Sequence, residues 1–233
     1  MSIQGITETD IANYLAHTPG FFERHAELLS TVQLTSPHGQ RAVSLQERQM
    51  EMLRDRIKGL ELRIVEMIRH GQENMGLNER LHRWTRALLV ASDAAQLPGI
   101  VTRELQHEFM IPQAALRVWG VDEVHAGASY TQGVSEDARS FAASLSAPYC
   151  GVNNGFEAAS WLEEPRTVMS LAMIPLRSPR AERSAEGPGA ATFGLLVLGS
   201  PDPTRYAADM GTEFLSRIGE MAGAALSRLL TAG

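Results

Sequence analysis

The chain has 233 residues, 44% of them apolar, and a formal net charge of −6, so it can bury a core and is a poor candidate for a general polyanion binder. No apolar run approaches the roughly 18 residues of a membrane span, and the N-terminus lacks the basic and apolar regions of a secretory signal. Cys150 is the only cysteine, which excludes an internal disulfide and fits a cytoplasmic location.

The first segment predicts two short helices and a turn. A helix is expected to run to about His17, with a capping box and a hydrophobic staple at its start, formed by Thr7 with Asp10 and by Ile6 with Ile11. Pro19 suits the first turn of a second helix, whose apolar residues are Phe21, Phe22, Leu28 and Leu29. The stretch Ser36-Pro37-His38-Gly39 predicts a turn.

A much longer helix is predicted between Ser44, which opens a second capping box, and about Ala91. Its apolar residues alternate by three and four positions, as in the seam of a coiled coil: Met50, Leu53, Ile57, Leu60, Ile64 and Met67. The seam weakens at His70, Gly71, Asn74 and Asn78, and an apolar pattern resumes in shifted phase at Leu77, Leu81, Trp84 and Leu88. A slip of three residues predicts a local overwinding or a break, which can fix register or serve as a hinge.

The rest of the chain alternates between strand and helix patterns. Helices are predicted over 98–109, 135–145 and 212–230, and strands over 114–120, 121–131, 168–176 and 192–199. The loops between paired strands are too short for parallel crossovers, so we expect an antiparallel sheet covered by helices, in an α+β fold.

Several stretches together resemble one bacterial family, called domain of unknown function 484. They are ITETDIANYLAHTPGFFERHAELL, AVSLQERQMEMLR, PYCG and DMGTEFLSRIGE, and the likeness extends from Ile6 to Leu229. The resemblance implies a C-terminal domain similar to GAF domains, which are relatives of PAS domains. Such domains have an antiparallel sheet, often a small-molecule pocket on one face, and commonly a dimer formed by the first and last long helices.

We therefore expect three parts: an N-terminal helical cap over 1–43, a coiled-coil helix over 44–78 and a GAF-like domain over 79–233. The predicted partner is a second copy of the chain. The predicted dimer interface consists of Met50, Leu53, Ile57, Leu60, Ile64, Met67, Leu81, Leu88, Ile218, Met221 and Ala225.

A small-molecule site has a few candidate residues in the GAF-like part. Trp119, Tyr149 and Trp161 can line an apolar pocket, with Arg117 and Asn153 as orienting polar groups. The alternative is that these aromatics belong to the core or to an interface. Cys150 is either a ligand contact or sensor thiol, or a buried wall residue, and the sequence names no cofactor.

Other chemistries have little support. His17, His25 and His38 lack the spacing of a metal pair, so no metal site is expected. No phosphate-binding or nucleophile motif occurs, and we expect no catalytic residue. The arginines of the long helix alternate with acidic residues, which does not favour direct nucleic-acid binding.

The sequence thus predicts a non-enzymatic regulatory dimer, in which a GAF-like sensor of small molecules acts through a coiled coil. The alternative is a protein–protein adaptor without a ligand. Members of the resembled family often lie beside a tyrosine recombinase gene, which links that alternative to a DNA recombination partner.

Overall fold

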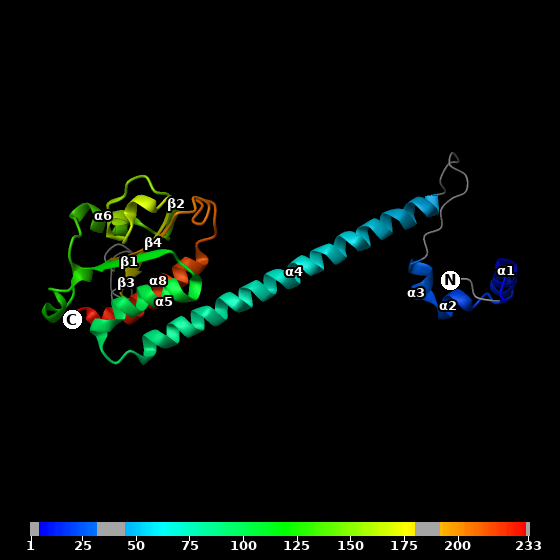
Figure 1. Cartoon of the computed structure of the whole chain (residues 1–233), viewed down its shortest axis with the longest axis horizontal. Coiled ribbons are helices and arrows are strands. Elements are labelled where there is room, and N and C mark those ends of the chain that lie inside the picture. The colour runs from blue at the N-terminus through cyan, green and yellow to red at the C-terminus, as the bar shows by residue number, and fades with distance from the viewer. Residues whose placement is uncertain (1–4, 32–44, 180–191, 232–233) are drawn as a thin grey trace. The chain divides into compact units, whose positions relative to one another are not determined.

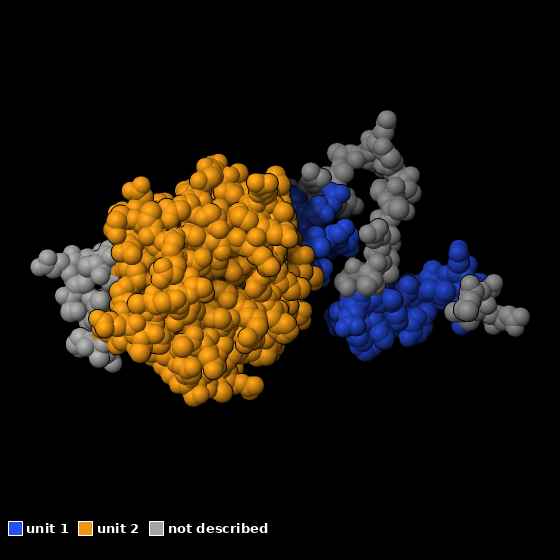
Figure 2. Space-filling model, turned by 60° about the vertical axis from the view of Figure 1, so that its left-hand side comes forward, with its two compact units in different colours: residues 1–64 blue, residues 65–233 orange. Residues whose placement is uncertain are grey.

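A series of helices precedes a four-stranded sheet in the computed structural model, which describes residues 5–31, 45–179 and 192–231 (Figure 1). The chain divides into two compact units, residues 1–64 and 65–233 (Figure 2). This division falls inside the long helix, and the predicted boundaries after residues 43 and 78 stay predictions.

The first unit begins with helix α1 (Glu8–His17), and the capping box predicted at its start is confirmed. The hydroxyl of Thr7 accepts a hydrogen bond from the Asp10 amide at 3.2 Å, and the Asp10 carboxylate accepts one from the Thr7 amide at 2.9 Å. Together these two bonds form the capping box.

The single helix predicted after Pro19 is wrong in detail, because two helices occupy this stretch: α2 (Phe21–Arg24) and α3 (Ala26–Thr31). His25 leaves helical geometry between them, with φ −124° and ψ 47°. Pro19 precedes the N-cap Gly20, so it lies outside the helix that it was predicted to start. The predicted turn at residues 36–39 falls outside the described residues.

The long helix is confirmed as α4 (Leu45–Val90), which has 46 residues. It stays helical through the predicted polar interruption, so the change of apolar phase does not mark a break in the helix. The capping box predicted at Ser44 falls outside the described residues.

The sheet has the order β1-β4-β3-β2, and all three pairings are antiparallel. Its strands are β1 (Gln113–Val118), β2 (Tyr149–Val152), β3 (Ser170–Arg177) and β4 (Thr192–Ser200). Three of them match predicted strands. The edge strand β2 was not predicted, because four residues with a glycine among them give too short an alternating pattern.

The strand predicted over 121–131 is wrong. Two 3₁₀ turns occupy the segment, η2 (Glu123–His125) and η3 (Ser129–Thr131). The Asp122 carboxylate accepts a hydrogen bond from the Val124 amide at 3.2 Å and so caps the first turn. Capping of this kind competes with strand pairing for the backbone.

Helices cover both faces of the sheet (Figure 1). The side that we call the α8 face packs against the end of α4, α5 (Leu97–Phe109) and α8 (Glu213–Leu226). The opposite α6 face packs against α6 (Glu136–Ser144) and the 3₁₀ helix η4 (Glu157–Trp161). The predicted α+β class, with a long helix ahead of a helix-covered antiparallel sheet, is confirmed.

Strand periodicity assigns the core residues to these faces, because successive side chains of a strand point to opposite sides. On β3, Ala172 and Ile174 belong to the α8 face, whereas Leu171 and Met173 belong to the α6 face. None of the helices among the described residues has the length and apolarity needed to cross a bilayer.

Candidate functional site

The predicted seam is an exposed apolar stripe on α4. Its six side chains are between 49% and 69% exposed, although all are large and apolar: Met50, Leu53, Ile57, Leu60, Ile64 and Met67. An ordinary surface helix turns such a stripe toward its own core. Here the stripe is free to meet another surface.

The C-terminal part of the same helix packs into its own domain instead. Leu81, Trp84 and Leu88 are 6%, 0% and 3% exposed in the α8-face core. The Trp84 indole N–H donates to the Val101 carbonyl at 3.3 Å, and the Thr85 hydroxyl reaches Met221 Sδ at 3.1 Å. Packing against α5 and α8 therefore explains the shifted apolar phase.

This packing changes part of the predicted dimer interface. Leu81, Leu88 and Ile218 are core residues of the chain itself, with Ile218 only 1% exposed. Met221 and Ala225 are partly buried and pack against the same core. The sequence pattern identified these five as apolar faces, but it contained no information on what would cover them.

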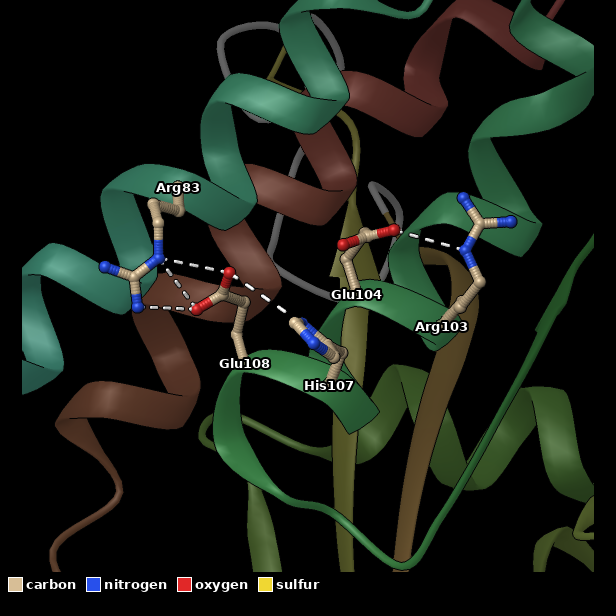
Figure 3. Close-up of polar contacts among 5 residues, drawn as sticks. All are labelled: Arg83, Arg103, Glu104, His107 and Glu108. Carbon is tan, nitrogen blue, oxygen red and sulfur yellow. Dashed lines mark hydrogen bonds and ion pairs between the residues drawn. The ribbon is translucent and has the colours of Figure 1, made fainter.

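An ion pair between Arg83 and Glu108 joins the buried C-terminal part of α4 to α5 (Figure 3). Nε of Arg83 donates to the two Glu108 carboxylate oxygens at 3.1 and 3.0 Å, and Nη2 donates to Oε2 at 2.7 Å. The hydrogen bonds from Arg83 lower the pKa of the Glu108 carboxyl group. Sequence reasoning missed Glu108, because its partner Arg83 lies 25 positions away.

Four of the predicted ligand residues contribute to the α6 face or its rim, and three of them donate hydrogen bonds to backbone carbonyls of the chain. Arg117 Nε donates to the Gln132 carbonyl at 3.0 Å, and its guanidinium lies 5.6 Å from the Trp161 ring centroid. The indole N–H of Trp161 donates to Gly133, and that of Trp119 donates to Thr192. Burial lowers the pKa of Arg117.

Tyr149 is the fourth of these residues, and Asn153 follows it at the end of β2. The Tyr149 ring packs edge-on against Phe141 and Phe156, with centroids 6.4 and 5.2 Å apart. The Asn153 amide donates to the Val168 carbonyl at 3.1 Å, and its oxygen accepts from the Gly155 amide at 3.1 Å. These two hydrogen bonds of the Asn153 side chain stabilise the backbone that follows β2.

Cys150 does not lie with these residues, because it points to the opposite, α8 face. It pairs in register with Ala172, which belongs to that face. Its side chain is buried, and burial raises the pKa of its thiol. A sensor thiol needs the reverse shift, so the geometry assigns Cys150 to the core wall.

The centre of the α6 face is filled by side chains. Leu171, Met173, Leu195 and Val197 are fully buried beneath Ala142 of α6. Since these residues belong to β3 and β4, the two central strands, the packed layer lies where a pocket over the sheet would have to open.

A cleft that sequence reasoning did not find lies beside β3 and α8, with a volume of about 420 Å³. Its lining residues are Ser146, Pro148, Ile174, Pro175, Arg177, Pro179, Ser216, Gly219 and Glu220. Nη2 of Arg177 donates to the Leu145 carbonyl, whereas its buried Nε has no hydrogen-bond partner in the described part of the chain. The one sign of this close packing in the sequence is the glycine at position 219, where α8 approaches β3 closely.

The histidines at the N-terminus have local partners. His17 Nδ1 donates to the Asn13 carbonyl at 2.7 Å, and the His25 ring lies 4.7 Å from that of Phe21. Within residues 5–31, 45–179 and 192–231, no group of three His, Cys, Asp or Glu side chains has an arrangement that could hold a metal ion. His38 lies outside these ranges.

Comparison with known proteins finds relatives along nearly the whole chain. Uncharacterized protein YigA of Escherichia coli strain K12 is 28% identical over 235 residues, covering 96% of this chain and 93% of the relative. YigA of Salmonella typhimurium strain LT2 is 27% identical over 234 residues, with the same coverage. Among solved structures, a GAF domain from Pseudomonas syringae pv. tomato aligns with a TM-score of 0.43 at 15% identity, covering 69% of this chain and 91% of that one.

The family model described as "Protein of unknown function, DUF484" matches residues 1–230. A match of that extent leaves out only the last three residues, and it agrees with the relatives found along the same length. The chain therefore belongs to the DUF484 family.

Proposed function

We propose that this protein is a non-enzymatic, dimeric adaptor of the cytoplasm, in which the seam of α4 pairs with a second copy of the chain. The observation that carries the proposal is the exposed stripe from Met50 to Met67. Six large apolar side chains at coiled-coil spacing form a contiguous patch, and patches of this kind mark interaction surfaces. Pairing would also stabilise a helix segment that has little tertiary packing of its own.

The packing of the sheet supports an adaptor over a small-molecule sensor. A pocket over the central strands would need space on the α6 face, where Met173 and Val197 are fully buried. The polar groups proposed to orient a ligand, Arg117 and Asn153, already bond to backbone groups. A ligand would have to displace these bonds as well as open the core.

Substitutions at two leucines distinguish the loss of seam packing from a general effect of an added charge. Leu60 lies in the seam and Leu62 lies two positions away, outside it, and both are about half exposed or more. Leu60→Glu should convert the dimer to a monomer at micromolar concentration, whereas Leu62→Glu should leave it intact. Light scattering after size-exclusion chromatography gives the mass, which should fall from twice the 25.5 kDa of one chain to a single chain.

The proposal fails if the wild type is monomeric at every concentration, or if the two variants behave alike. Equal loss in both would point to charge or helix propensity as the cause. Equal retention would show that the seam does not hold the dimer.

Small-molecule sensing is a second candidate, and the cleft beside α8 is the observation in its favour. This cleft, unlike the α6 face, is an open space, and two residues of opposite charge, Arg177 and Glu220, are among those that line it. Native mass spectrometry of freshly purified protein should show a retained molecule that disappears in Arg177→Ala. A wild-type mass equal to the bare chain or dimer would remove this candidate.

A further inference from the structure

We infer that the α4 seam forms a parallel, in-register, two-stranded coiled coil with a second copy of this chain. The inference rests on the proposed function, because it presupposes that the seam pairs. It goes further by fixing the number of strands, their direction and the residues that face each other.

The choice of side chains in the seam indicates two parallel strands. With Met50 at position a of the heptad, Ile57 and Ile64 also fall at a, and Leu53 and Leu60 fall at d. β-branched residues at a combined with leucine at d favour parallel dimers over trimers and tetramers. All five side chains are exposed on the single chain and so are available for knobs-into-holes packing.

The charges beside the seam indicate the same direction. In a parallel dimer, each g position faces the e position five residues further along the partner. Arg56 then meets Glu61 of the second copy, and symmetry repeats this attraction on the other side. The remaining two contacts, Gln49 with Arg54 and Arg63 with Ile68, bring no like charges together.

An antiparallel dimer would lose this advantage. Antiparallel pairing places g opposite g and e opposite e, so that Arg56 of one copy meets Arg63 of the other. The attraction between Arg54 and Glu61 would only offset that repulsion. Parallel pairing therefore has two attractive contacts and no repulsive one.

Cysteine cross-linking tests the direction in the full chain. The variants are Met50→Cys and Met67→Cys, one near each end of the seam, because a disulfide requires Cα atoms within about 7 Å. Under mild oxidation, each variant alone should form a covalent dimer, and a mixture should form no 50–67 species. The wild type, whose Cys150 is buried, and Leu62→Cys, which lies outside the seam, should both stay uncross-linked.

A 50–67 disulfide in the mixture, with neither variant cross-linking alone, would overturn the parallel arrangement while leaving dimerisation intact. A monomer in light scattering would instead overturn the proposed function, so the two failures can be told apart. A covalent dimer from Leu62→Cys at the same rate would show random collision and would also count against the inference.

Charge reversal gives an independent test, because it should change the dimer dissociation constant in opposite directions for parallel and antiparallel pairing. In the parallel dimer, Arg56→Glu faces Glu61 of the partner and should raise the dimer dissociation constant by roughly 2- to 30-fold. In the antiparallel dimer, it would face Arg63 and lower that constant. The double variant Arg56→Glu/Glu61→Arg should restore parallel pairing, and failure to restore it would contradict the proposed contact.

Discussion

Two stretches of α4 have similar apolar spacing and very different surroundings. Residues 50–67 are exposed throughout the seam, whereas Leu81, Trp84 and Leu88 are buried in the sheet domain. The helix does not break between them. The comparison shows that regular apolar spacing identifies the face of a helix that is expected to be buried. It does not identify the surface that packs against that face, which has to be found from the structure.

The largest effect is expected from the buried stretch. Trp84→Ala removes a fully buried indole and its hydrogen bond to Val101, and should lower the free energy of unfolding by about 3–5 kcal/mol. Leu62→Ala, in the exposed stretch of α4 but outside the seam, should change it by less than about 0.5 kcal/mol. Urea unfolding at one protein concentration measures both. Similar losses in the two variants would contradict the assignment of buried and exposed stretches.

A second test concerns how tightly α8 packs in the sheet domain. A Cβ at Gly223 would clash with the Arg177 carbonyl oxygen, so Gly223→Ala should destabilise the domain by about 1–3 kcal/mol. Gly99 lies in α5 with open space around it, and Gly99→Ala should be neutral or stabilise by up to about 1 kcal/mol. Thermal unfolding should give opposite or clearly different shifts. Equal shifts would mean that α8 does not pack closely on β3.

The smallest effect is expected from the ion pair between α4 and α5. Because the pKa of Glu108 is lowered in the folded state, its stabilising effect is present above the unfolded value, near 4.5, and is lost as pH falls through the folded value. Glu108→Gln should therefore lower the Tm slightly at pH 7, and the difference from wild type should vanish in acid.

Glu104→Gln is the matched control for this ion pair. Glu104 pairs with Arg103 of the same helix, α5 (Figure 3). Its effect on the Tm should be smaller still. A difference between Glu108→Gln and the wild type that grows in acid would contradict the sign of the pKa shift.

Local signals explain which parts of the fold were predictable. The capping box of α1, the continuous apolar strands β3 and β4, and the long helix each depend on spacing within a few residues, and all were predicted correctly. The strand β2 and the 3₁₀ turns after β1 were not, because β2 is short and the first of the turns depends on a side-chain cap at Asp122. Local pattern is weak evidence wherever tertiary contacts decide.

The candidate site was less predictable, for reasons that concern direction and distance. Strand residues 149 and 150 point to opposite faces, and without β2 the sequence could not place Cys150 away from Tyr149. The cleft beside α8 brings together Ser146 from the loop before β2, Arg177 from β3 and Glu220 from α8. A motif within one continuous stretch of sequence could therefore not predict this cleft.

Hydrogen–deuterium exchange of α4 as a function of protein concentration tests the contrast between its two stretches most directly. We predict that amides over residues 50–67 lose protection on dilution, as the seam separates, whereas amides over residues 81–90 stay protected by their own domain. Protection over 50–67 that does not change while the dimer dissociates, or that falls together with protection over 81–90, would contradict the claim that a second copy of the chain covers the seam.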